Sequence, residues 1–142
     1  MKTVQAIIDL FGGISQLPDN PIKIEVEGFM PLSIEFIGTG PREWPLVAVI
    51  HFYEQDGDLM RDPEMQFEVD PEGIWHPVYY RQDSLMMVQG AVFRSSETGE
   101  VMIRSKLIRE FQQFMKLWDQ NLQDQGFLDK AREMTDKHNP SE

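Results

Sequence analysis

Hydrophobic and polar residues alternate along most of the chain, and the period of this alternation changes twice. Apolar residues recur at helical spacing between Val4 and Phe11 and are followed by Gly12 and Gly13, which predicts a short amphipathic helix. From residue 22 the period becomes two, which is typical of half-buried strands. From residue 107 the spacing of three and four returns and predicts a long helix that ends at Gly126.

The segment between these two helices contains six or seven strand patterns with no helical pattern among them. The strands are expected at residues 22–27, 32–36, 46–53, 64–70, 74–80, 88–94 and 101–104. Short turns between consecutive strands favour antiparallel pairing. We therefore predict an α+β fold in which a six- to seven-stranded, mainly antiparallel twisted sheet has the N-terminal helix and the long C-terminal helix packed on one face. Residues 1–128 are expected to form a single domain. Residues 129–142 lose the apolar periodicity and are expected to form a flexible C-terminal tail.

Acidic residues are concentrated in the middle of the chain. Between Glu54 and Glu72 lie eight acids and one base, Arg61, so these nineteen residues carry −7 of the net charge of −11. Because acids alternate with apolar residues in the predicted strands, we expect one face of the sheet to present carboxylates to water. The predicted acidic face consists of Glu25, Glu27, Glu35, Glu64, Glu68 and Asp70.

An acidic face has three possible uses. It favours a positively charged partner, such as a basic or nucleic-acid-binding protein, and disfavours direct binding to nucleic acid or an anionic membrane. Carboxylates along adjacent strands also resemble a row of phosphates, so a DNA-mimic inhibitor of a host nucleic-acid-binding defence enzyme is an alternative. The same charge also keeps a protein soluble without any partner.

The acid cluster from Asp56 to Glu64 supports a metal-binding alternative. Asp56 and Asp58 have the spacing of the first two ligands of a calcium loop, but Arg61 occupies the position at which that loop needs glycine. Asp and Gly in this arrangement are also typical of a hairpin turn. The metal-binding alternative, as a binding protein or a metal-dependent enzyme, would use Asp56, Asp58, Asp62 and Glu64 together with His51 or His76.

The absence of cysteine and of common catalytic motifs excludes several classes of enzyme. The chain has no cysteine, which excludes disulfides and thiolate chemistry, and its serines and glycines lie outside nucleophile-elbow and phosphate-loop motifs. We therefore favour a non-enzymatic role and expect no cofactor. The first apolar stretch is too short for a signal peptide, and no stretch approaches the ~18 apolar residues of a membrane-spanning helix. We expect a cytoplasmic protein that is a monomer or a weak homodimer.

Tyr79 and Tyr80 are adjacent in a predicted strand. Neighbouring side chains in a strand point to opposite faces, so we expect one ring to be partly exposed and available for a partner contact. The other ring is expected to pack in the core.

Several segments of the sequence resemble a known family. The segments are Gly28–Glu35, Gly57–Met65, Trp75-x-Pro77 and Tyr80-x-Gln82-Asp83. They are similar to a family of small uncharacterised domains found in Firmicutes, often on plasmids, phages and conjugative elements. No activity or catalytic residue is established for this family, so the resemblance implies only an accessory or host-interaction role. The chain departs from the family pattern at Met86–Gly90, where a binding surface would be altered.

Overall fold

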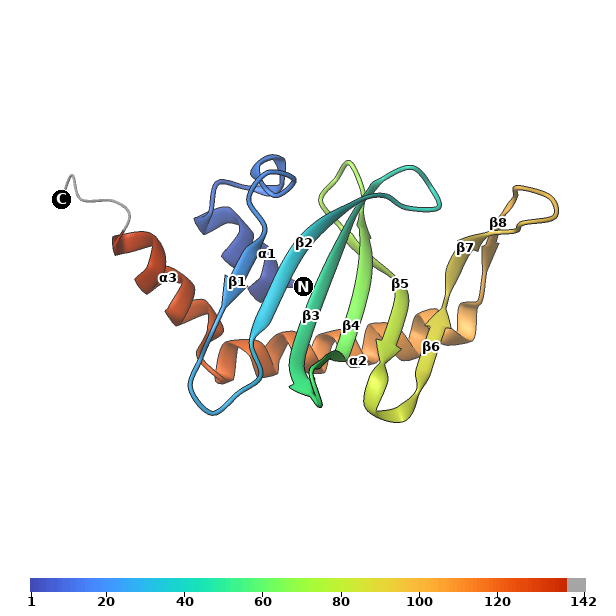
Figure 1. The fold of residues 1–142 in the computed structure, drawn as a ribbon. Coiled ribbons are helices and arrows are strands. Elements are labelled where there is room, and N and C mark those ends of the chain that lie inside the picture. Colours follow the sequence, from blue (N-terminus) through green and yellow to red (C-terminus); the bar gives the residue numbers. More distant parts are fainter. Residues whose placement is uncertain (138–142) are drawn as a thin grey trace.

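The computed structural model describes residues 1–137, and its elements follow the predicted order of helix, strands and helix (Figure 1). Two short 3₁₀ turns, η1 (Ile14–Gln16) and η2 (Asp83–Leu85), lie between the longer elements. The helices are α1 (Lys2–Leu10), α2 (Ser105–Asp124) and α3 (Phe127–Lys137). The strands are β1 (Ile22–Ile24), β2 (Leu32–Thr39), β3 (Pro45–Gln55), β4 (Asp58–Val69), β5 (Trp75–Gln82), β6 (Met87–Gly90), β7 (Val92–Arg94) and β8 (Val101–Ile103).

Strands β1 to β6 form one antiparallel sheet in chain order, which confirms the predicted α+β fold class. β7 and β8 form a separate two-stranded sheet beside it. The predicted strand 88–94 is divided at Ala91, whose N–H donates to Val78 O while its carbonyl accepts from the Arg104 N–H. These two bonds tie the chain to β5 and to the start of α2, so the direction of the strand changes there.

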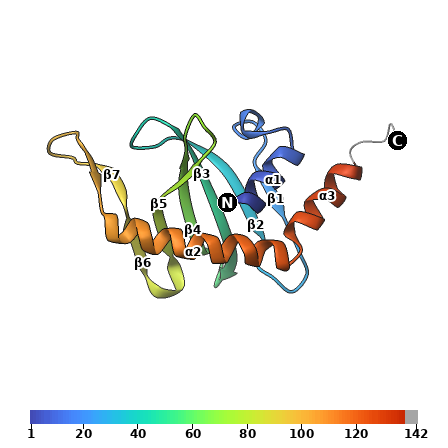
Figure 2. The same cartoon turned by 180° about the vertical axis from the view of Figure 1, so that it is seen from behind.

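The three helices lie on one face of the sheet (Figure 2). α2 runs across the strands, and α1 and α3 pack against it and against each other. The core between the helices and the sheet is apolar because each strand directs alternate side chains toward the helices. Its fully buried members include Ile7 and Ile8 of α1, Ile34, Val49 and Phe67 of the sheet, and Leu122 of α2.

Two polar contacts fix α1 on the rest of the molecule. The Thr3 N–H donates to both carboxylate oxygens of Asp119 at 3.1 Å, so a side chain of α2 satisfies the N-terminal turn of α1. The Trp75 indole N–H donates to Gln5 Oε1 at 2.9 Å. These bonds hold α1 over the start of β5.

The prediction of a flexible tail from residue 129 is wrong for residues 129–137, because α3 continues to Lys137. Phe127 and Ala131 are fully buried and Leu128 is nearly so, and α3 packs on α1 and on β1. Apolar residues at spacings of three and four give α3 one buried face, but the face is too short to stand out in the sequence. Residues 138–142 of the predicted tail lie outside the described residues.

None of the helices within residues 1–137 is both long enough and apolar enough to span a bilayer.

Candidate partner-binding surface

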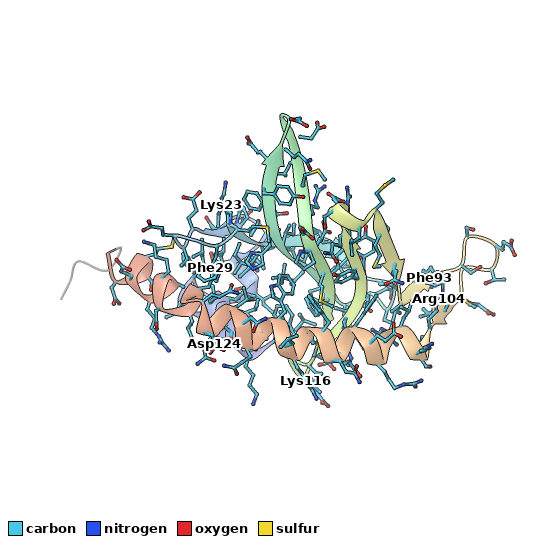
Figure 3. The ribbon with its side chains drawn as sticks, turned by 90° about the horizontal axis from the view of Figure 1, so that it is seen from below. Lys23, Phe29, Phe93, Arg104, Lys116 and Asp124 are labelled. Atoms are coloured by element: carbon cyan, nitrogen blue, oxygen red, sulfur yellow. The ribbon has the colours of Figure 1, made fainter. Side chains whose placement is uncertain are left out.

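Within residues 1–137, no helix crosses the face of the sheet opposite α1, α2 and α3, which we call the uncovered face. Figure 3 shows Lys116 on the outer side of α2, Lys23 on the far side of the sheet, and the β3–β4 hairpin projecting away from α2. One continuous row crosses all six strands of this face, with one residue from each strand opposite the next. In strand order the row is Lys23, Ser33, Ile50, Glu64, Arg81 and Val88.

Glu68 belongs to the predicted acidic face but is fully buried, so the expectation that its carboxylate faces water is wrong. Its Oε1 accepts from Arg42 Nε at 2.7 Å, and its Oε2 accepts from the backbone N–H groups of Arg42 and Trp44 at 2.9 and 3.4 Å. A Cβ at Gly40 would overlap the Glu68 side chain. Glu68 therefore holds the β2–β3 loop against β4, and glycine is what allows the loop to close over it.

Glu64 is also buried, with 7% of its surface exposed, which corrects the same expectation at this position. Its carboxylate accepts from Arg61 Nε at 3.1 Å and from Gln66 Nε2 at 2.6 Å. Arg81 lies opposite Glu64 on β5 and donates from Nε to Asp83 at 2.6 Å. This hydrogen bond, the backbone N–H of Arg61 and the adjacent positive charges lower the pKa of Asp83. The charges of β4 and β5 are thus largely compensated.

On the uncovered face, the compensated charges of β4 and β5 give the DNA-mimic alternative no row of exposed carboxylates. A phosphate-like row needs exposed carboxylates on neighbouring strands. The row across the uncovered face instead contains a lysine, a serine, two apolar residues and the opposed pair Glu64 and Arg81.

Asp70 organises the turn between β4 and β5. Its Oδ2 accepts from His76 Nε2 at 2.8 Å, and its Oδ1 accepts from the backbone N–H groups of Glu72 and Ile74 at 2.9 and 3.0 Å. The hydrogen bond from His76, followed by that from the Ile74 N–H, lowers the pKa of Asp70. Asp70 is half-buried, and three donors already occupy its carboxylate.

The other three members of the predicted face remain accessible to different degrees. Glu35 lies on the uncovered face of β2, is half-buried and accepts from Ser33 Oγ at 3.0 Å. Glu25 and Glu27 are exposed, but they follow β1 instead of lying within it, because the strand ends at Ile24. The predicted face therefore does not form one continuous surface.

Exposed acids are found instead at one end of the sheet. In the antiparallel meander the β1–β2 loop and the β3–β4 turn lie at the same end, which is the lower end in Figure 1. We call this region the acidic end. Its exposed acids are Glu25 and Glu27 of the loop and Glu54, Asp56 and Asp58 of the β3–β4 hairpin.

A groove of about 660 Å³ lies between the β1–β2 loop and β3, within the acidic end. We call it the acidic-end groove, and its lining includes the rings of Phe29, Phe52 and Tyr53 and the carboxylates of Glu25 and Glu54. Lys23 also lines it, with Nζ 4.9 Å from the centre of the Phe52 ring (Figure 3). This distance is within the range of a cation–π contact, so the groove already holds one cation over an aromatic ring.

A second hollow of about 330 Å³ continues from this groove along the uncovered face. The two share Lys23, Phe52 and Glu54, and the second adds Leu59, half of whose surface is exposed. The lining of the two hollows combines aromatic and apolar side chains with the acids Glu25, Glu35 and Glu54, and it also includes the cations Lys23 and Arg61. Such a surface suits a side chain with an apolar stem and a cationic head.

Tyr79 and Tyr80 point to opposite faces of the sheet, as the alternation predicts. The Tyr80 ring packs on Phe111 and Phe114 of α2, its hydroxyl donates to Gln82 Oε1 at 2.7 Å, and burial raises its pKa. Tyr79 is half-buried and lines a hollow of about 390 Å³ on the uncovered face. Of the two rings, that of Tyr79 is therefore the one that lines a hollow on the uncovered face.

The residues of the metal-binding alternative are dispersed. His51 lies in the core, 5.5 Å from the Trp118 ring and 5.4 Å from the Phe127 ring, and its Nδ1 donates to Pro31 O at 3.2 Å. His76 faces the other side of the sheet and bonds to Asp70.

The acids of the same alternative are also separated by their contacts. Asp56 and Asp58 are exposed in the hairpin, Asp62 accepts from Ser84 Oγ at 3.1 Å, and Glu64 bonds to Arg61. Within residues 1–137, no three His, Asp or Glu side chains are placed to share a metal ion.

Phe29, Phe52 and Glu54 were not identified as site residues from the sequence. Phe52 lies in a strand that reads as continuously apolar, and Phe29 lies in a turn. Phe52 lies on the uncovered face because it is two residues from Ile50 in β3, and a bulge in β4 brings Arg61 opposite it. An exposed phenylalanine in the turn Gly28–Pro31 was the available signal.

The comparisons with known proteins agree with the resemblance seen in the sequence. No curated protein and no solved structure shows a significant match to the chain. Residues 2–128, from α1 to the first turn of α3, match a family described as a domain of unknown function, DUF6908. The chain therefore belongs to the DUF6908 family.

Proposed function

We propose that the protein is a non-enzymatic, cytoplasmic accessory domain that binds a basic segment of a partner protein in the acidic-end groove. The observation that carries this proposal is the position of Lys23, whose Nζ lies 4.9 Å from the centre of the Phe52 ring in a groove that Glu25 and Glu54 also line. A lysine or arginine of a partner would find the same chemistry beside it: aromatic faces for the head group and acids at the rim.

The charge distribution supports a basic partner. The five acids of the acidic end are exposed, and within residues 1–137 none of them forms an ion pair. Uncompensated acids around a groove attract a cationic segment over a distance of about one Debye length, ~8–10 Å, and raise its association rate. The buried carboxylates of Glu64 and Glu68 are compensated by arginines and contribute little to this field.

The family resemblance supports an accessory role. The resemblance noted in the sequence implies a setting on plasmids, phages and conjugative elements, which favours a role in binding host or element proteins. A basic partner in that setting would be a nucleic-acid-binding protein, and the groove would recognise its basic segment instead of the nucleic acid.

A titration with a short oligoarginine peptide tests this proposal. Calorimetry measures the affinity, and changes in the amide NMR shifts of the labelled protein locate the binding site. The double variant Glu25→Lys/Glu54→Lys should lower the affinity about tenfold, because two rim carboxylates become ammonium groups. The matched control Glu97→Lys/Glu100→Lys changes the net charge equally at the exposed β7–β8 loop, away from the groove, and should leave most of the affinity intact.

The variant Phe52→Leu tests the contribution of the aromatic ring to binding separately from that of the carboxylates. It keeps every carboxylate and should still weaken binding by about threefold, since an exposed cation–π contact contributes about 0.5–1 kcal/mol. Equal weakening in the acidic-end variant and in its charge-matched control would contradict the proposal, because attraction would then follow net charge and not the groove.

A further inference from the structure

The two edge strands of the six-stranded sheet are protected to different degrees. β1 has three residues, follows Pro21, carries Lys23 at its centre and contacts α3. Charge, proline and a covering helix are the usual means by which an edge avoids pairing with another chain. β6, at the other edge, has four residues, and none of them is charged or proline.

The backbone of β6 has a pair of groups directed to the open edge. The Ala91 N–H donates to Val78 O, so the pairs between β5 and β6 that exchange hydrogen bonds are Ala91 with Val78 and then Gln89 with Tyr80. Val88 lies between these pairs, and its N–H and C=O therefore point away from β5. The next outward carbonyl, that of Gly90, accepts from Arg104 Nη1 at 3.5 Å.

The side chains around this edge are apolar and exposed. Leu85, Met86, Met87 and Val88 are consecutive, and their exposed fractions are 62%, 93%, 37% and 62%. A run of four exposed large apolar residues beside an open strand edge is the usual mark of an interface in a folded protein. Covering this apolar surface with a second strand removes it from water and so lowers the free energy.

We propose that β6 pairs antiparallel with β6 of a second copy of this chain, around a two-fold axis at Val88. The N–H of each Val88 donates to the C=O of Val88 in the other copy, so the two sheets become one continuous sheet. This inference goes beyond the proposed function and does not depend on it, because the acidic-end groove lies toward the opposite edge of the sheet.

Shape favours a second copy as the partner. Around an axis at Val88, Met87 lies opposite Gln89 of the other copy. Gly90, which has no side chain, then lies beside the segment of the other copy that leads from η2 through Met86 into β6. A hollow of about 340 Å³ between β6 and α2, lined in part by Phe111 and Phe114, borders Met87 and Gln89. The hollow that Tyr79 lines on the uncovered face borders Gly90. Each copy thus offers space where the other offers a methionine.

Charge also favours a second copy. Met86 to Gly90 contain no charged residue. A charged segment of another protein would therefore find no opposite charge on this strand, whereas the identical, uncharged strand of a second copy needs none. The acidic end, which would repel another copy, includes the β1–β2 loop at the opposite edge. A dimer through β6 therefore keeps the groove acids of the two copies apart.

Sedimentation equilibrium over a wide concentration range tests the proposal. We expect the mass to rise with concentration from 16.6 kDa toward twice this value. Val88→Pro should give a monomer at all concentrations, because it removes the outward N–H without breaking a bond inside the monomer. Val88→Lys should do the same by placing like charges at the axis, and it keeps the test valid if the proline variant does not fold.

Leu117→Lys is the matched control, since Leu117 is exposed to a similar extent, 61%, on α2. It should dimerise like the wild type. A wild-type protein that stays monomeric, or a dimer that both Val88 variants retain, would overturn the proposal. Binding of an extended apolar peptide at β6 by a monomeric wild type would likewise overturn it in favour of a peptide partner.

Discussion

At the scale of single residues, His51 connects three elements of the core. Its imidazole comes from β3 and lies between Trp118 of α2 and Phe127 of α3, and its Nδ1 hydrogen donates to the Pro31 carbonyl. Burial lowers the pKa of His51, although the Pro31 carbonyl acts in the opposite direction. The folded protein therefore favours the neutral ring.

This lowered pKa makes folding stability depend on pH. The unfolded chain, with a histidine pKa of about 6.5, binds a proton more readily than the native state. The free energy of unfolding should therefore be fully maintained above about pH 6.5 and fall as the pH drops through that value toward the folded pKa. Urea unfolding at several pH values measures this slope, and His51→Phe, which keeps an aromatic ring in the same place, should reduce it. A slope identical to that of the wild type would contradict the assignment.

The buried carboxylates of Glu64 and Glu68 explain why the sequence predicts the exposed acidic residues only in part. Strand alternation correctly assigns Glu64 and Glu68 to the face away from the helices. It does not show that the loop from Gly40 to Trp44 folds over Glu68, or that Arg61 covers Glu64. Those contacts depend on a loop conformation, and no periodic pattern records one.

At the scale of elements, α3 completes the core. Phe127, the first residue of the helix, is fully buried, and its ring lies 6.5 Å from that of Phe29 in the β1–β2 loop. This contact joins the helix layer to the loop that forms one wall of the acidic-end groove. α3 therefore supports both the fold and the candidate site.

Removing the Phe127 ring should have a large effect for this reason. Phe127→Ala should lower the free energy of unfolding by about 3–5 kcal/mol, which is typical of a fully buried phenylalanine. Arg132→Ala, on the exposed face of the same helix, should change it by less than about 0.5 kcal/mol. Denaturant unfolding of the three proteins measures both values. Similar values for both variants would show that α3 does not belong to the cooperative core.

The elements themselves were largely predictable. The long strands and α2 bury one face each, so their apolar periodicity is strong and their order gives the antiparallel meander. α3 was missed because a helix of eleven residues repeats its apolar face only a few times. The division of residues 88–94 at Ala91 was missed because it depends on two backbone hydrogen bonds with distant residues.

At the scale of the whole molecule, charge is distributed unevenly. Exposed acids surround the acidic-end groove toward the β1 edge, while the strand at the β6 edge is neutral. The two proposed contacts therefore involve different forces: one joins opposite charges, and the other joins apolar surfaces of two copies with the same net charge.

The two contacts should consequently respond to salt in opposite directions. Raising the ionic strength from ~0.05 to ~0.5 M should weaken oligoarginine binding severalfold, because screening removes the attraction. The same change should strengthen dimerisation by about twofold or more, because it screens repulsion between two acidic copies. Calorimetry and sedimentation in matched buffers measure both constants. A dimer that dissociates with added salt would show that ion pairs, and not β6, hold the copies together.

The packing of α1 on α3 has a consequence for biosynthesis. A ribosome adds α3, which packs beside α1, more than a hundred residues after it has completed α1. Until then Val4, Ile7 and Ile8 lack part of the surface that buries them. The nascent chain cannot close this core step by step as it emerges, so the synthesis of α3 decides when the core becomes complete. Chains that stall before α3 should therefore be ready substrates for chaperones and proteases.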